Sequence, residues 1–127
     1  MPILQVTALP QPVAIDVSAA SAALALAVSV ELGEELSGTW VTWQTLAAGT
    51  YIEGDTRGPE QQPRATHPPI VRVLAFQGRP PEVVARVLSA VAETIVRELD
   101  LEPGNAFVVW DELQAGQVHS GGVMPGV

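Results

Sequence analysis

Cysteine and lysine are both absent from the 127 residues of the chain. Without cysteine there are no disulfide bonds, no thiol catalysis and no cysteine-ligated zinc. Without lysine, Schiff-base chemistry on a lysine is excluded. All six basic residues are arginines, and 14 acidic residues give a net charge of −8. An acidic chain with few basic residues is a poor candidate for nucleic acid or an anionic membrane, and we expect neither partner.

Long hydrophobic runs and a basic leader are also missing. The apolar stretch 19–30 is interrupted by serines, has no basic residues before it and is too short to span a bilayer. Hydrophobic residues still make up 47% of the chain, enough for the core of a single domain of this length. We therefore expect a cytoplasmic protein. Two histidines without cysteine are weak grounds for a metal site, and we expect no metal and no cofactor.

What the chain does contain is an internal repeat. Residues 2–9 read PILQVTAL and residues 69–76 read PIVRVLAF, an offset of 69 − 2 = 67. The same offset aligns WVTW at 40–43 with FVVW at 107–110 without a gap. Over the 59 pairs from residue 2 to residue 60 there are 16 identities, too many in one ungapped register for a coincidence. We predict two units, 2–60 and 69–127, joined by a polar, proline-bearing surface linker at 61–68.

Each unit has the pattern of a strand, a helix and a second strand. The openings 2–9 and 69–76 are almost continuously apolar, which favours strands buried on both faces. Apolar positions then recur at helical spacing over 17–32 and 84–99, with Pro80 and Pro81 suited to a first turn. Asp16 or Ser18 would begin the first helix, and Gly33 would end it in a left-handed cap. The second strands are predicted at 39–44 and 106–111.

Two such units predict an α+β (α/β) fold in one domain covering 1–127. Each β-α-β unit supplies a parallel pair of strands, and together they form a four-stranded mixed sheet with two helices on one face. The other face of the sheet then lacks cover, and a unit of about 60 residues is marginally stable alone. Both points favour an oligomer that buries the bare face.

The opening proline and the region after residue 69 together resemble the tautomerase superfamily. Pro2 follows Met1 directly, and unit two has Pro69-Ile70, then Gly78-Arg79 before its helix. Its second strand leads into 112–116, ELQAG, and a glycine pair at 121–122. This resembles 4-oxalocrotonate tautomerase, whose subunit is one β-α-β unit. The two-unit arrangement is similar to cis-3-chloroacrylic acid dehalogenase, malonate semialdehyde decarboxylase and macrophage migration inhibitory factor. The resemblance implies a tautomerase-like fold and a homotrimer.

The resemblance also implies roles for single residues. Pro2 matches the catalytic amino-terminal proline, and Arg79 matches an arginine that binds the substrate carboxylate. Pro12 stands at the equivalent place in unit one, so this arginine is present once. The family's second arginine falls on Trp40 and Phe107, which makes these aromatics candidates for the pocket wall.

Other family positions are filled less clearly. The aromatic residue that lines the family's pocket falls on Tyr51 or Val118. The acidic residue that activates water in the cis dehalogenase falls near Ser120, which argues against dehalogenation by hydration. Glu31, Glu34 and Glu35 are interpreted as the solvated end of a helix, and His67 and His119 as solvated loop residues.

These residues predict an isomerase. Removal of Met1, which precedes a proline, would leave Pro2 with a secondary amine whose ordinary pKa is about 8, usable as a general base near neutral pH. Arg79 would hold a carboxylate with its planar fork and stabilise an enolate. We expect keto-enol tautomerisation of a small 2-keto or 2-hydroxydienoic acid. The alternatives are a decarboxylase, or a hydratase or dehalogenase, that uses the same proline, and a non-catalytic trimeric binding protein with a vestigial pocket.

Overall fold

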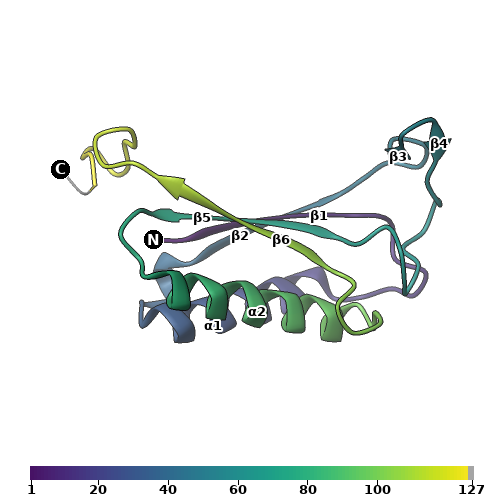
Figure 1. The fold of residues 1–127 in the computed structure, drawn as a ribbon, viewed down its shortest axis with the longest axis horizontal. Coiled ribbons are helices and arrows are strands. Elements are labelled where there is room, and N and C mark those ends of the chain that lie inside the picture. Colours follow the sequence, from purple (N-terminus) through teal and green to yellow (C-terminus); the bar gives the residue numbers. More distant parts are fainter. Residues whose placement is uncertain (126–127) are drawn as a thin grey trace.

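Two helices lie side by side against one face of a four-stranded sheet (Figure 1). The computed structural model describes residues 1–125, so the last two residues of the second predicted unit lie outside the described residues. The strand order is β2-β1-β5-β6. The main elements in chain order are β1 (Ile3–Ala8), α1 (Val17–Leu32), β2 (Trp40–Thr45), β5 (Ile70–Phe76), α2 (Pro81–Glu98) and β6 (Phe107–Leu113).

The register of the sheet repeats at the offset seen in the sequence. β1 pairs with β2 in parallel, with Ile3 opposite Trp40. β5 pairs with β6 in parallel, with Ile70 opposite Phe107, which is the same pair moved by 67 residues. β1 and β5 are antiparallel neighbours in the middle. The predicted fold, two β-α-β units in one mixed sheet with both helices on one face, is therefore confirmed.

The helix ends follow from local sequence. Asp16 is the N-cap of α1, where its Oδ1 accepts a hydrogen bond of 3.0 Å from the backbone N–H of Ala19. Gly33 ends α1 at φ 63°, the left-handed conformation that glycine adopts without strain. Pro80 and Pro81 stand at the start of α2, where no N–H is needed for the helix.

The core lies between the sheet and the helices. Alternate strand residues, such as Leu4 and Val73, point into it and are fully buried. They meet Leu24 and Val28 of α1 and the buried stripe of α2. That stripe consists of Val87, Val91 and Ile95. Trp43 and Trp110 pack against the same cluster from the edge strands, as expected for strand aromatics on the helix side.

The opposite face of the sheet is open within one chain, which corrects one expectation. The opening strands were predicted to be buried on both faces, but residues in β1 alternate between buried and half-buried, and those in β5 between buried and more exposed. Both helices cover the same face, so alternate residues such as Ile70 remain uncovered on the other. On this open face Arg72 forms an ion pair with Asp111.

The second strands begin one residue later than predicted, at Trp40 and Phe107, and they end one and two residues later. The reason is a backbone hydrogen bond between the first residue of each second strand and the proline that opens the same unit. The N–H of Trp40 donates to the carbonyl oxygen of Pro2 at 3.1 Å, and that of Phe107 to Pro69 at 2.9 Å. This first ladder bond sets where each strand starts.

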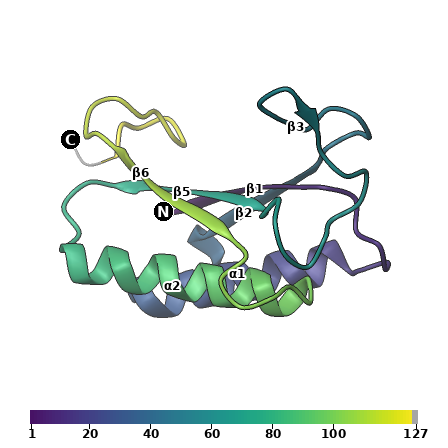
Figure 2. The same cartoon turned by 45° about the vertical axis from the view of Figure 1, so that its right-hand side comes forward.

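Two loops rise from opposite ends of the sheet on the side of the open face (Figure 2). One carries a short hairpin of β3 (Ile52–Glu53) and β4 (Thr56–Arg57), in which Glu53 pairs with Thr56. The other, after β6, contains the bridge Ser120 to Val123, which is that pair moved by 67 residues. A 3-10 turn, η1 (Leu36–Gly38), precedes β2. No helix within residues 1–125 is long and apolar enough to cross a membrane.

The stretch between the two predicted units is more closely attached than a free surface linker. Gln62 is buried, its N–H donates to the carbonyl oxygen of Pro10 at 2.7 Å, and its side-chain Nε2 donates to that of His67 at 2.7 Å. Thr66 and His67 both have positive φ values, 62° and 46°. The interpretation of 61–68 as a surface linker thus does not hold for Gln62, because its amide satisfies backbone groups of the connection.

Candidate active site

The start of the chain and the loop after β5 meet at one end of the sheet. Because β1 and β5 are antiparallel, with Ile3 opposite Leu74, the first residues of β1 lie beside the last residues of β5. Pro2 precedes β1 and is fully buried. Arg79 follows β5 and is partly buried, with 29% of its side chain exposed. The topology therefore brings the two predicted catalytic residues to the same end of the molecule.

A third residue, Glu34, joins them. Its Oε2 lies 2.7 Å from the amine of Met1, and its Oε1 forms an ion pair with Nη2 of Arg79. Nη1 of Arg79 also donates to the carbonyl oxygen of Leu32 at 3.4 Å, at the end of α1. The Glu34 side chain is only 24% exposed. One carboxylate thus bridges the amine at the start of the chain and the guanidinium that follows β5.

The electrostatics of this cluster keep Glu34 ionised. Burial raises the pKa of the Glu34 carboxyl, but hydrogen bonds and charge from the Met1 amine and from Arg79 outweigh it. The net result is a pKa below its ordinary value of 4.5. At neutral pH, therefore, the site contains a fixed anion between two groups that carry positive charge.

A shallow, open hollow of about 490 Å³ lies beside this cluster. Trp40 lines it with 47% of its surface exposed, and Met1 and Glu34 line it from the other elements. The remaining lining residues are Gly33, Glu35, Ser37 and Gly38. Met1, the residue before Pro2, lines this hollow, whereas Pro2 and Arg79 do not. Its wall is aromatic at Trp40 and anionic at Glu34 and Glu35.

Two predicted wall residues lie elsewhere in the chain. Phe107 is 57% exposed and pairs with Ile70 at the start of β5, which is the opposite end of the sheet from Pro2. Tyr51 follows β2 at that same opposite end, next to the β3–β4 hairpin. Of the predicted site residues, one chain brings together Pro2, Arg79 and Trp40, and it leaves Phe107 and Tyr51 apart.

Tyr51 belongs to a small cluster of its own. Its hydroxyl donates to Oε1 of Glu53 at 2.9 Å, and its ring meets that of His67 edge to face with centroids 5.4 Å apart. Nδ1 of His67 contacts the same carboxylate. Burial, together with the hydrogen bond to Glu53 and its charge, raises the pKa of Tyr51. His67 is therefore a partly covered contact residue, not the solvated loop residue that the sequence suggested.

The equivalent positions at the opposite end of the sheet do not reproduce the charged cluster. At the offset of 67, Glu34 corresponds to Leu101 and Arg79 to Pro12. Pro69 corresponds to Pro2 and is equally buried, but its nitrogen lies in a peptide bond. Each chain therefore has one end with a carboxylate, a guanidinium and an amine, and one end with apolar residues in those places.

Sequence reasoning missed Glu34, which was interpreted as part of a solvated helix end. The offset contained the signal, because each member of the ion pair has an apolar residue at the equivalent position of the other unit. Reading Glu34 against Leu101 and Arg79 against Pro12 would have indicated that the two charges belong together.

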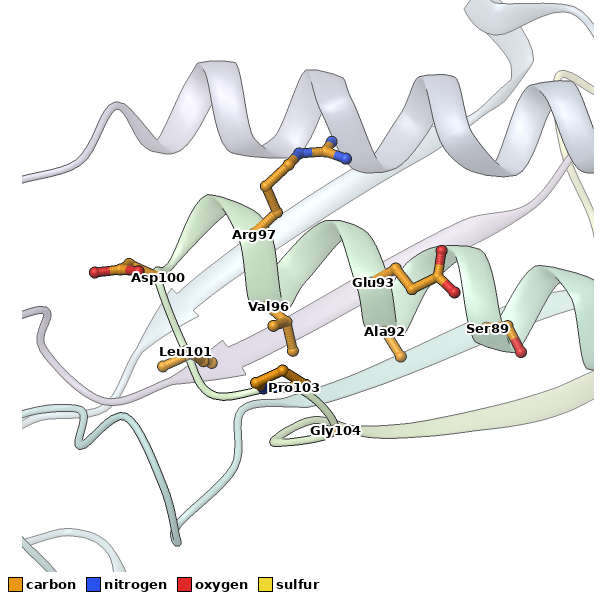
Figure 3. A pocket seen from close by; sticks show the side chains of 9 residues that line it. All are labelled: Ser89, Ala92, Glu93, Val96, Arg97, Asp100, Leu101, Pro103 and Gly104. Atoms are coloured by element: carbon orange, nitrogen blue, oxygen red, sulfur yellow. The ribbon is translucent and has the colours of Figure 1, made fainter.

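A further hollow of about 490 Å³ lies away from Pro2, between α2 and the turn that follows it. The side chains of Val96, Leu101 and Pro103 gather there, while Arg97 points toward α1 (Figure 3). Within residues 1–125, no group of three or more histidine or acidic side chains is arranged to hold a metal ion.

Comparison with solved structures identifies the architecture. A symmetric trimer of wild-type fused 4-OT superposes with a TM-score of 0.80 at 20% identity, covering 96% of this chain and 94% of that one. A member of the cis-3-chloroacrylic acid dehalogenase family, N1, gives 0.78 at 17% identity, covering 98% and 85%. Macrophage migration inhibitory factor of Toxoplasma gondii gives 0.65 at 16% identity, covering 96% and 98%.

The chain has a tautomerase-like fold. The fused 4-OT match covers nearly the whole of both chains, so the two-unit arrangement as well as the single unit is shared. The sequence itself matches no family model and no curated protein. At these identities the likeness establishes the fold, and the chemistry has to be argued from the residues of this chain.

Proposed function

We propose that the chain is a tautomerase-like isomerase that moves a proton between oxygen and carbon of a small 2-keto or 2-hydroxydienoic acid, with Pro2 as base and Arg79 as carboxylate anchor. The observation that carries the proposal is the nearness of Pro2 and Arg79. The carboxylate of Glu34 reaches both the amine of Met1, the residue before Pro2, and the guanidinium of Arg79. A substrate carboxylate held by Arg79 would therefore lie close to the Pro2 amine that removal of Met1 exposes.

The proposed chemistry requires removal of Met1. Pro2 would then carry a free secondary amine, which accepts the hydroxyl proton of an enol as its carbonyl forms and returns that proton to carbon. No proton is gained or lost overall. Pro2 is fully buried in the chain that carries Met1. If the proline ring keeps this position once Met1 is removed, its packing would shield the amine partly from water, which favours the neutral form.

Arg79 supports both binding and turnover in this proposal. Its fork would hold the substrate carboxylate, and its charge would stabilise the enolate that develops next to it. Trp40 would form the apolar wall against the carbon chain of the substrate, since it lines the hollow beside Glu34 and is half exposed.

The assembly proposed for this activity is a cytoplasmic homotrimer. The fused 4-OT structure that matches the chain is a trimer. The open sheet face, flanked by two rising loops, is the surface that such an assembly would cover. Phe107 and Tyr51, which lie far from Pro2 in their own chain, would then be wall residues for the site of a neighbouring chain.

The non-catalytic alternative follows if Met1 is retained, because a retained Met1 would lock the nitrogen of Pro2 in a peptide bond. Intact mass spectrometry separates the two readings, because loss of Met1 lowers the mass by one methionine residue. A protein that keeps Met1 in full contradicts Pro2 as a base.

The activity is tested by following 2-hydroxymuconate and phenylenolpyruvate by ultraviolet absorbance with the purified protein. We expect conversion of the enol to the ketone above the uncatalysed rate for at least one of them, and loss of that gain in Pro2→Ala. A rate equal to buffer for both substrates would count against the tautomerase proposal and in favour of a binding protein.

A further inference from the structure

Glu34 occupies the position at which a ligand carboxylate would meet Arg79. Both oxygens of Glu34 are engaged, one by the terminal amine at 2.7 Å and the other by the guanidinium. The side chain is mostly shielded from water, and its pKa is lowered, so it is present as an anion. The fork of Arg79 therefore already has an anionic partner from its own chain.

The second unit indicates that Glu34 is not required by the fold. Gly33 and Asp100 are equivalent residues after the two helices, and both are left-handed, with φ values of 63° and 52°. The backbone thus takes the same course, but Leu101 stands where Glu34 would be, and Pro12 stands where Arg79 would be. The carboxylate occurs only at the end of the molecule that also contains the arginine.

We infer that Glu34 is a specificity-determining residue: it competes with the carboxylate of an incoming ligand for Arg79, and so it lowers the affinity of the site for acids relative to uncharged carbonyl compounds. The inference rests on the proposed role of Arg79 as the carboxylate anchor. In this role Glu34 limits how tightly Arg79 binds the carboxylate of a ligand.

The physical reason is an exchange of equivalent contacts. A carboxylate that enters must separate Glu34 from Arg79, and it gains a charge-assisted pair of the same kind as the one lost. An uncharged ester of the same acid leaves the Glu34–Arg79 pair intact. Replacing Glu34 by glutamine removes the competing charge and keeps the shape, so only the acid should bind more tightly.

The experiment measures the affinity of phenylpyruvate and of its methyl ester by ligand titration in nuclear magnetic resonance spectra of the protein. We expect Glu34→Gln to tighten phenylpyruvate binding by at least about fivefold and to leave the ester within about twofold. Glu31→Gln is the matched control. It removes one carboxylate from another ion pair with an arginine, that of Glu31 with Arg86, outside the hollow lined by Trp40, and is expected to change neither affinity by more than about twofold.

Two further variants keep the result decisive. Glu34→Leu copies the residue of the second unit and serves if the glutamine variant unfolds. Glu34→Gln combined with Arg79→Gln should lose the gain, because the gain depends on a freed guanidinium. An unchanged or weaker affinity for phenylpyruvate in the folded Glu34 variants, no binding to any variant, or an equal gain in Glu31→Gln would each overturn the inference.

The outcome is separable from that of the proposed activity. The titration reads binding and needs no turnover, whereas the proposed activity is read from proton transfer in the absorbance assay. A protein that is inactive in the assay but shows the gain in Glu34→Gln refutes the tautomerase proposal and retains the inference. An active protein without the gain does the reverse.

Discussion

Gln5 and Arg72 are equivalent residues of the two units, since 5 + 67 = 72, and they face each other directly across β1 and β5. Nη1 of Arg72 donates to Oε1 of Gln5 at 3.1 Å. The pairs on either side, Leu4 with Val73 and Val6 with Val71, are exchanged by the same offset. An approximate two-fold axis therefore passes through the sheet between Gln5 and Arg72.

The approximate two-fold symmetry is broken where the chemistry is proposed. It would place an equivalent of Pro2 and Arg79 at the far end of the sheet, but the chain has Pro69 and Pro12 there. The tertiary amide nitrogen of Pro69 and the apolar ring of Pro12 cannot replace an amine and a guanidinium. The fold is thus duplicated, whereas the charged site is single.

The core is the first place where the structure can be tested by mutation. Leu24 of α1 is fully buried against both the sheet and α2. Leu24→Ala should lower the free energy of unfolding by about 2–5 kcal/mol, because it removes buried methyl groups and leaves a cavity. Leu26→Ala, on the outward side of the same helix with 54% exposure, should change it by less than about 0.5 kcal/mol. Urea denaturation followed by circular dichroism measures both, and equal effects would contradict the packing described.

The open sheet face predicts the oligomeric state. Light scattering should give three chains of 13.3 kDa, about 40 kDa in total, at micromolar concentration. Ile70→Glu places a charge on the open face and should shift the mass toward one chain, whereas Val30→Glu on the exposed side of α1 should leave the trimer intact. A stable wild-type monomer would refute the trimer.

Arg79 should contribute mainly to substrate binding. If tautomerase activity is found, Arg79→Ala should raise KM and lower kcat/KM by the equivalent of about 2–4 kcal/mol, because a charge-assisted contact to the carboxylate is lost. Pro2→Ala should mainly lower kcat. Some activity can survive that change, because alanine still supplies a primary amine.

A matched control for the arginine is Arg86, which is exposed on α2 and pairs with Glu31 at 3.5 Å. Arg86→Ala removes the same charge away from Pro2 and should leave kcat/KM within about twofold. Steady-state kinetics at fixed ionic strength decide the matter. If neither Pro2→Ala nor Arg79→Ala lowers the activity tenfold, the assignment of the site is wrong.

Glu34 predicts a pH-dependent part of the stability. Its pKa is lowered by the folded surroundings, so the stability it contributes is present above the unfolded pKa of 4.5 and is lost as the pH falls through the lower folded value. The difference in the free energy of unfolding between wild type and Glu34→Gln should therefore be larger at pH 6 than at pH 3. Denaturation curves at pH 6 and pH 3 measure this difference. The mass of the protein is determined first, because it shows whether Met1, whose amine pairs with Glu34, is present.

Glu35→Gln serves as the reference for that pH series, because Glu35 is exposed and adjacent in sequence. Its difference from wild type should be small at both pH values. A Glu34 effect that does not decline between pH 6 and pH 3, or that Glu35→Gln reproduces, would show that the Glu34–Arg79 pair does not stabilise the fold.

The sequence by itself determined the arrangement of the elements, because that arrangement depends on local and periodic features. The apolar stripes over 17–32 and 84–99 and the caps at Asp16 and Gly33 predict both helices. The repeat at 67 predicts that both units share one topology. A repeated β-α-β unit with a short connection has few ways to pair its strands, so a four-stranded mixed sheet followed.

Only the tertiary structure decided which charges meet. Glu34 and Arg79 are 45 residues apart, and Met1 is 33 residues from Glu34, so no local pattern relates them. They come together because the antiparallel pairing of β1 with β5 brings the start of one strand beside the end of the other, next to the end of α1. The same pairing separates Phe107 and Tyr51 from Pro2 within one chain. Ion pairs between residues far apart in the sequence form only when the tertiary structure brings their elements together. Periodicity in the sequence indicates only which face each element buries.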